Sequence, residues 1–164
     1  MLTINLFNGL VYGALLIVMS SGLALIYGLR RVVNFAHGAL YMLGAYIGYS
    51  VALHSNFWVA LVAAPAAMAV VGVLLDRYGL RLLQDREPLN VMLVTFGLLL
   101  ILEDLVVFIW GKTNYSMFTP PLLDFTVNLW GNDVPAYRIG VIAVGAAVAV
   151  GLTLWLRHSR IGLF

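Results

Sequence analysis

The chain has 164 residues, of which 63% are hydrophobic and 10% are charged, and its mean hydropathy is +1.00. A soluble globular domain carries about a quarter charged residues, so this composition excludes an ordinary soluble fold and indicates an integral membrane protein. The absence of cysteine from the sequence excludes disulfides, thiolate nucleophiles and cysteine-ligated metals. With a net charge of only +2, the few basic residues are better interpreted as topology signals than as a nucleic-acid interface.

Five stretches of the chain are apolar enough to be membrane helices, the second only marginally. A helix that crosses the hydrocarbon core of a bilayer needs about 20 mostly apolar residues. The first stretch is longer than the core of a signal peptide, so we expect it to be a retained helix. The sequence therefore predicts an all-α bundle forming a single transmembrane domain over residues 1–164. The predicted spans cover residues 6–29, 33–53, 57–75, 91–110 and 136–156.

The basic residues of the predicted links fall mainly on one side of the membrane. Seven lie in alternate links, namely Arg30, Arg31, Arg77, Arg81, Arg86, Arg157 and Arg160. The other two are Lys112 and Arg138. Because positively charged loops stay in the cytoplasm, this asymmetry predicts an N-terminus outside and a C-terminus inside.

Two links are long enough to carry structure of their own. Residues 76–90 alternate leucine and arginine and predict a short amphipathic helix at the inner interface, stopped by Pro88. Residues 111–135 are rich in aromatic residues and proline, which favours an interfacial cap on the outer face. Within this cap, the weak alternation of residues 124–130 allows a short strand.

Pairs of small residues spaced four apart recur on four of the predicted helices. Such spacing lets helix backbones approach closely, which matters in lipid because no hydrophobic force drives helices together. The repetition predicts a compact bundle. The pairs are Gly9 and Gly13, Gly44 and Gly48, Ala63 and Ala67, and Ala147 and Gly151.

The second predicted helix carries a polar stripe. Its members are Asn34, His37, Tyr41, Gly44 and Gly48. Their offsets place them along one helical face, with polar side chains at its start and glycines towards its end. Two interpretations remain open. The stripe lines a path for a polar solute, or Asn34 caps the helix, His37 bonds a neighbouring carbonyl and the glycines only permit packing.

Glu103 and Asp104 stand side by side in the fourth apolar stretch. Neighbouring residues point about 100° apart on a helix, so the two carboxylates do not form a dyad that shares a proton. Carboxylates inside a membrane are costly and are functional candidates by default. The alternative is that Glu103 is neutral or hydrogen-bonded inside the bundle while Asp104 approaches the outer headgroups.

No motif for catalysis, nucleotide binding or metal binding is complete. The triplet Gly111-Lys112-Thr113 resembles the end of a phosphate-binding loop, but Val106 occupies the position where that loop needs its first glycine. The three histidines, His37, His54 and His158, fall on different segments without metal-ligand spacing. We therefore expect no enzyme activity, no cofactor and no metal site.

Residues 22–38, with the core Asn34-Phe35-Ala36-His37-Gly38, and residues 41–46 after them closely resemble the permease subunits of branched-chain amino acid ABC importers of the LivH type. Residues 156–163 are similar to the family's Ser/Thr-Arg-Ile/Leu-Gly junction. The resemblance spans essentially the whole chain and is weakest in the outer loop. Because family members are considerably longer, the chain resembles the N-terminal portion of such a permease.

The resemblance implies a multi-pass protein of the bacterial inner membrane that translocates leucine, isoleucine or valine. The implied partners are a second permease subunit, cytoplasmic ATPase subunits that hydrolyse ATP, a periplasmic amino-acid-binding protein and the lipid bilayer, but no nucleic acid. On this hypothesis Asn34, His37 and Tyr41 line or hinge the path, and Glu103 orients a neighbouring helix. Gly44 and Gly48 complete the candidate gating set.

Three alternative functions remain open. The solute could be urea or a short amide, although Phe35 favours the amino-acid branch of the family. A proton-coupled secondary transporter could relay protons through Glu103, Asp104 and His37. The chain could also be a fragment or scaffold that does not transport.

Overall fold

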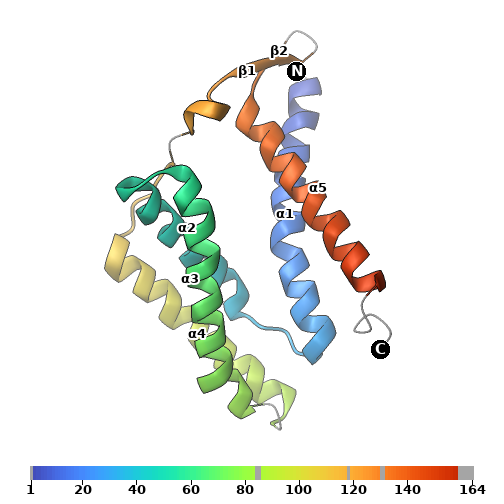
Figure 1. Cartoon of the computed structure of the whole chain (residues 1–164). Coiled ribbons are helices and arrows are strands. Elements are labelled where there is room, and N and C mark those ends of the chain that lie inside the picture. Colours follow the sequence, from blue (N-terminus) through green and yellow to red (C-terminus); the bar gives the residue numbers. More distant parts are fainter. Residues whose placement is uncertain (1, 84–85, 118, 130–131, 159–164) are drawn as a thin grey trace. The chain divides into compact units, whose positions relative to one another are not determined.

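The structure is a computed structural model that describes residues 2–83, 86–117, 119–129 and 132–158. Its five α-helices overlap the five predicted apolar stretches, which confirms the predicted helical membrane fold (Figure 1). The α-helices are α1 (Leu2–Arg30), α2 (Ala36–His54), α3 (Phe57–Tyr78), α4 (Pro88–Trp110) and α5 (Ala136–His158). The shorter elements are η1 (Leu80–Leu83), η2 (Pro121–Leu123), β1 (Thr126–Leu129) and β2 (Asn132–Pro135).

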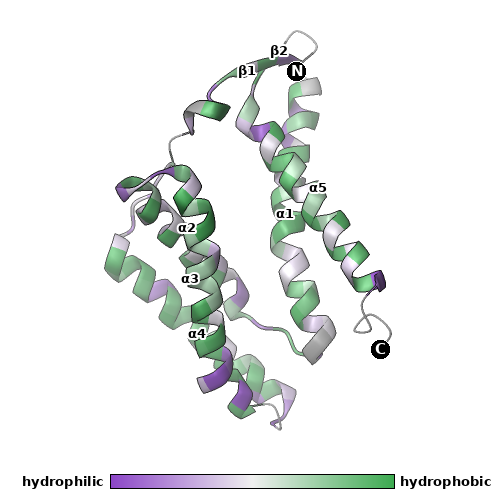
Figure 2. Cartoon of the chain, in the orientation of Figure 1, coloured by the Kyte–Doolittle hydropathy of each residue, from purple (hydrophilic) through white to green (hydrophobic). Residues whose placement is uncertain are grey.

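Four helical stretches in the described ranges are long and apolar enough to cross a membrane, and apolar residues dominate their ribbons (Figure 2). These stretches are Ile4–Gly28, Phe57–Leu83, Pro88–Trp110 and Ala136–His158. The helix α2, whose predicted span was marginal, is not among them. Its sequence carries a histidine at each end and three tyrosines between, which lower its hydropathy.

Local signals explain where the helices begin and end. The side-chain oxygen of Asn56 accepts a hydrogen bond from the N–H of Val59 at 2.9 Å and starts α3. Pro88 lies in the first turn of α4, where a backbone N–H has no partner within the helix, so the missing N–H of proline loses no hydrogen bond. Pro88 therefore ends the preceding link and also begins α4. Gly111 ends α4 with a φ of 80°, a conformation that favours glycine. The amphipathic helix expected in residues 76–90 is reduced to the last turn of α3 and the short η1.

The chain divides into two compact units. Unit 1 comprises Met1–Leu25 and Thr119–Phe164, and unit 2 comprises Ile26–Phe118.

In unit 1, α1 and α5 touch at Ala14 and Gly145. A Cβ built on Gly145 would lie 2.7 Å from the Cβ of Ala14, so the two helices meet with no room for a side chain. Near the start of both helices, Arg138 donates a hydrogen bond to the side-chain oxygen of Asn8 at 2.6 Å. Asn8 precedes Ala14 in α1, and its partner Arg138 likewise precedes Gly145 in α5. The two helices therefore run in the same direction (Figure 1).

The small-residue pairs expected to pack on these two helices are not used in that way. A Cβ built on Gly9, Gly13 or Gly151 would meet no described atom within 4 Å. Ala147 is exposed. These positions therefore make no close contact within unit 1, because small-residue spacing permits an approach of two backbones without requiring it.

The segment of unit 1 that precedes α5 contains an antiparallel pair of strands, β1 and β2. A side-chain hydrogen bond of 3.0 Å from Asn128 to Asp133 joins the two strands. The N–H of Ala136 donates to the carbonyl oxygen of Phe125 at 2.9 Å, which attaches the start of α5 to the residue before β1. The strand expected within residues 124–130 is confirmed as β1, whereas its partner β2 was not predicted.

Unit 2 is a bundle of α2, α3 and α4 in which α2 contacts both other helices. Ala39 and Leu43 of α2 form a buried core with Leu102 and Val106 of α4. On another side, α2 runs antiparallel to α3. A Cβ on Gly44 would lie 3.1 Å from Met68, and one on Gly48 would lie 3.3 Å from Ala64. Here the small residues do allow close helix packing, as the sequence predicted.

The helices α2 and α4 run parallel and in register. The N–H of Phe35 donates to Oγ1 of Thr95 at 3.3 Å, and Nε1 of Trp110 donates to Oγ of Ser50 at 2.7 Å. Both pairs are separated by 60 residues, and the two contacts are about 22 Å apart along α4. The helix α2 therefore lies alongside α4 over this length. Protein contacts on two sides explain how it tolerates a less apolar sequence than its neighbours.

Candidate functional site

Asn34 caps the start of α2. Its side-chain oxygen accepts a hydrogen bond from the N–H of Ala36 at 3.0 Å, and its carbonyl accepts from the N–H of His37 at 3.2 Å. Both N–H groups belong to the first turn of a helix, where they have no partner within the helix itself. The chain reaches this cap after Arg31, whose φ is 53°. Asn34 therefore makes capping hydrogen bonds to this first turn, although Phe35 occupies the N-cap position and its own side chain makes no capping hydrogen bond.

A buried threonine fastens the same turn to α4. Thr95 is fully buried, and its hydroxyl accepts from the N–H of Phe35 and donates to the carbonyl of Met92 at 3.0 Å. The ring of Phe35 meets the ring of Phe96 edge-on at 6.3 Å between centroids. Sequence reasoning missed Thr95, because a threonine inside an apolar stretch usually bonds only to its own helix.

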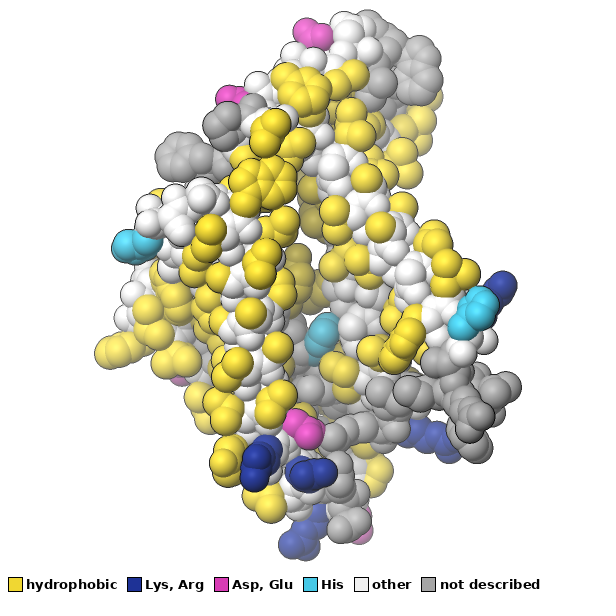
Figure 3. All heavy atoms as spheres, viewed as in Figure 1, with side chains coloured by type: hydrophobic (Ala, Val, Ile, Leu, Met, Phe, Trp, Pro, Cys, Tyr) yellow, Lys and Arg dark blue, Asp and Glu magenta, His cyan; other side chains and the backbone are white. Residues whose placement is uncertain are grey.

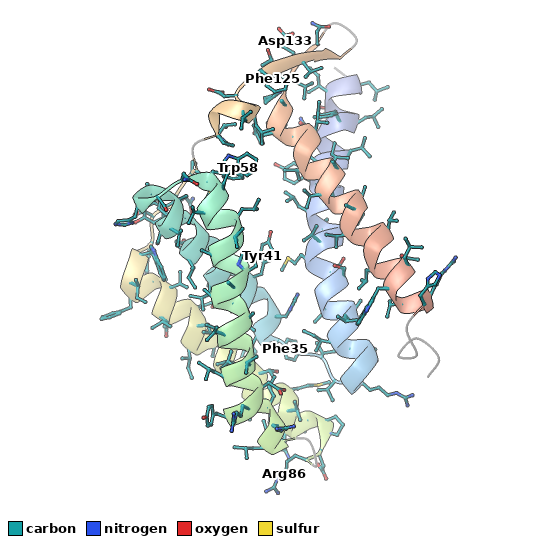
Figure 4. The ribbon with its side chains drawn as sticks, in the orientation of Figure 1. Phe35, Tyr41, Trp58, Arg86, Phe125 and Asp133 are labelled. Carbon is teal, nitrogen blue, oxygen red and sulfur yellow. The ribbon has the colours of Figure 1, made fainter. Side chains whose placement is uncertain are left out.

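The polar part of the α2 stripe is partly open. Tyr41 is 48% exposed and His37 is half-buried. The two residues are four apart and share a face, while Ala39 and Leu43 point towards α4. Figure 4 labels both Tyr41, which lies within α2, and Phe35, which directly precedes this helix. Within unit 2, Tyr41 is thus the member of the stripe that is most accessible.

The glycine part of the stripe is covered by α3, through the contacts of Gly44 and Gly48 described above. The structure thus divides the predicted stripe between a capped, partly open start and a packed end. A role of Gly44 and Gly48 in a translocation path stays a prediction, and their observed contacts are those of helix packing.

Glu103 and Asp104 are exposed on α4, beside the buried Leu102. Neither carboxylate makes a hydrogen bond or an ion pair with any residue that the structure describes. Within unit 2, Glu103 thus has no hydrogen-bond partner among the described residues, and both interpretations of the two carboxylates stay predictions. The expected role of Glu103 in orienting a neighbouring helix also stays a prediction.

An aromatic cluster that the sequence did not predict gathers where α2 and α4 end. The ring centroid of Tyr46 lies 5.4 Å from that of Trp110, and Tyr115 lies 6.1 Å from Tyr46 and 4.7 Å from Tyr49. The hydroxyl of Tyr115 donates to the carbonyl of Trp110 at 2.7 Å. Tyrosine and tryptophan favour membrane interfaces, and here they also hold the segment after α4 against α2.

The remaining sequence predictions concern metal ligands, the histidines and the junction at residues 159–164. Among the residues that the structure describes, no group of three or more His, Cys, Asp or Glu could hold a metal ion. The rings of His54 and His158 each lie within hydrogen-bond distance of a carbonyl of their own helix. Arg160 and the rest of the junction at residues 159–164 lie outside the described residues.

Taken together, the helices define a multi-pass integral membrane protein. The chain belongs to the family described as branched-chain amino acid transport system / permease component, which matches residues 5–164.

Curated relatives support this family. The chain is 28% identical over 173 residues to the high-affinity branched-chain amino acid transport system permease protein BraD of Pseudomonas aeruginosa. It is 23% identical over 172 residues to the corresponding protein LivH of Salmonella typhimurium and of Escherichia coli. Each match covers 96% of this chain and 56% of the relative, so the chain spans about half the length of these relatives. No solved structure matches the chain significantly.

Proposed function

We propose that this chain is the membrane-embedded permease part of a binding-protein-dependent ABC importer that moves leucine, isoleucine or valine inward. The observation that carries this proposal is the family match over residues 5–164, together with relatives whose names state branched-chain amino acid transport. The bundle of apolar helices with a polar, partly open start of α2 is compatible with this function.

The proposal includes an orientation in the bacterial inner membrane. In unit 2, the arginines of the described residues lie at the end where α2 and α4 begin, and Lys112 follows the opposite end of α4. Figure 3 shows basic side chains gathered near the start of α4. Because positively charged loops stay in the cytoplasm, this end would face the cytoplasm and the aromatic cluster would face the periplasm.

The proposed partners follow from this class of importer. A second permease subunit would complete the membrane core, a periplasmic binding protein would deliver the amino acid, and separate cytoplasmic subunits would hydrolyse ATP. Coupling would then work by shifting a helix bundle between two conformations, since a ligand acts only through its different affinity for two states.

In this proposal the start of α2 borders the path, with Asn34, His37 and Tyr41 as the candidate lining residues. Tyr41 is exposed and has no hydrogen bond to the described residues, so its hydroxyl is available to a polar solute. Asn34 already caps α2 and therefore shapes this end of the path. Gly44 and Gly48 act indirectly by holding α2 against α3.

The experiment is uptake of radiolabelled leucine by cells that produce the complete importer containing this chain and lack other leucine transporters. We expect uptake that requires the binding protein and ATP, survives a protonophore when ATP is maintained, and is blocked by excess isoleucine or valine. Competition by urea or acetamide instead of valine would favour the amide-transporting alternative. Collapse of uptake by the protonophore with ATP intact would overturn the ABC mechanism in favour of proton coupling.

A further inference from the structure

The turn before α2 is held by one buried hydroxyl group on another helix. Thr95 is the only buried polar residue among those that the structure describes. Its hydroxyl joins the N–H of Phe35 to the carbonyl of Met92, so it both donates and accepts. In lipid, a polar group that lacks a hydrogen-bond partner costs free energy. We therefore expect both hydrogen bonds of the Thr95 hydroxyl to be formed most of the time.

The contact has consequences for the residues around it. Phe35 stands between Asn34, which caps α2, and His37, which follows one residue after the start of the helix. Fixing the N–H of Phe35 on α4 therefore fixes the position of the cap and of the first turn. The edge-on contact of Phe35 with Phe96 adds a second attachment to the same part of α4.

We propose that Thr95 is a positioning residue for transport, because its hydroxyl sets where the Asn34–His37 turn lies relative to α4. The inference rests on the proposed function, since it concerns the path that this turn would border. Thr95 itself does not contact the solute. It acts through the backbone of Phe35, and the contact between Ser50 and Trp110 at the other end keeps α2 in register with α4.

The first arm of the test measures amide hydrogen exchange at Phe35 in the assembled importer. Thr95→Val keeps the shape of the side chain and removes the hydroxyl, whereas Thr95→Ser keeps the hydroxyl. We expect exchange at Phe35 to be about fivefold faster in Thr95→Val, the factor that corresponds to a typical net hydrogen bond. Thr95→Ser should exchange like the wild type.

Thr153→Val is the matched control, because Thr153 also lies in a membrane helix but its hydroxyl bonds only to the carbonyl of Ala149. This control should leave the exchange at Phe35 unchanged. If Thr95→Val is not recovered from membranes, Thr95→Ala provides the same comparison. Wild-type exchange at Phe35 in either hydroxyl-free variant would overturn the proposal, and so would an equal change in the control.

The second arm measures leucine uptake for each permease molecule in the membrane. We expect Thr95→Val to lower the maximal rate by roughly fivefold or more and to leave KM unchanged, because the binding protein sets KM in the proposed importer. Thr95→Ser should restore the rate. Faster exchange at Phe35 with an unchanged maximal rate would overturn the positioning role. If the wild-type importer takes up no branched-chain amino acid, the proposed function fails, and the exchange arm alone decides whether Thr95 holds the turn.

Discussion

The indole N–H of Trp110 donates to the hydroxyl of Ser50 at 2.7 Å and joins the last turns of α4 and α2. The hydroxyl of Ser50 in turn donates to the carbonyl of Tyr46 at 2.9 Å, so the serine is engaged on both sides. This contact has the same sequence separation as the contact between Phe35 and Thr95 near the other end of the pair. These two contacts have the same register and hold α2 and α4 together as a parallel pair.

Replacing Ser50 by alanine should destabilise this pair. The half-buried indole N–H of Trp110 would lose its partner, which costs about 1–3 kcal/mol for a buried donor and less where water can reach it. We expect a lower unfolding temperature in nanodiscs and a changed tryptophan emission. Ser50→Thr keeps a hydroxyl and serves as the control. An unchanged unfolding temperature in Ser50→Ala would contradict the proposed importance of this contact.

Replacing Gly44 by leucine should separate α2 from α3. Even a Cβ at this position would lie 3.1 Å from the side chain of Met68, so that side chain must move to admit a methyl group, and a leucine requires a larger displacement. We expect uptake to be lost while the protein still inserts into the membrane, as shown by fractionation and immunoblotting. Gly97→Leu is the matched control because nothing described lies within 4 Å of a Cβ there. Normal uptake by Gly44→Leu would refute the packing argument.

Replacing Gly145 by leucine should disrupt the crossing of α1 and α5 in unit 1. The nearest atoms to a Cβ at this position belong to Ala14, and two of them are backbone atoms that a rotamer change cannot move. Overpacking of this kind costs about 1–3 kcal/mol, and backbone contacts favour the upper part of that range. Thermal unfolding in detergent should show the loss, whereas the same change at Gly151 should be tolerated. Equal stability of the two variants would argue against the crossing.

Neutralising the carboxylates of α4 separates two mechanisms. Glu103→Gln and Asp104→Asn keep the side-chain shapes and remove the titratable groups. In an ABC importer we expect uptake to retain its ATP dependence and a rate within about threefold of the wild type, since neither carboxylate bonds to a described residue. A proton relay would lose transport in at least one variant. The measurement is leucine uptake with and without a protonophore.

The sequence predicted the helices because apolar runs of sufficient length are a local signal that lipid makes decisive. It also predicted the packing of Gly44 and Gly48, where small residues on α2 face Ala64 and Met68. Phe35 and Asn34 could be singled out from a local motif, and the cap that Asn34 forms is a contact with its own chain two residues on.

The remaining contacts depend on which helices become neighbours, and that information is not local. Thr95 and Ser50 each form a hydrogen bond with a residue 60 positions away in the sequence. No sequence pattern distinguishes either residue from a serine or threonine that bonds only to its own helix. The same limit explains why Gly9 and Gly13 make no close contact within unit 1, although their spacing matches that of Gly44 and Gly48. The aromatic cluster of Tyr46, Trp110 and Tyr115 likewise requires the parallel pairing of α2 and α4.

We propose that all five helices cross the membrane, α2 among them, with the arginine-bearing links in the cytoplasm. Because the sequence has no cysteine, single substitutions report sidedness without background. We would label intact spheroplasts with a membrane-impermeant maleimide after changing Arg31, Ser55, Arg81 or Lys112 to cysteine. We expect labelling from outside at Ser55→Cys and Lys112→Cys, and labelling at Arg31→Cys and Arg81→Cys only after permeabilisation. Labelling of Ser55→Cys and Arg31→Cys from the same side would show that α2 does not cross, and labelling of Arg81→Cys in intact spheroplasts would contradict the proposed orientation.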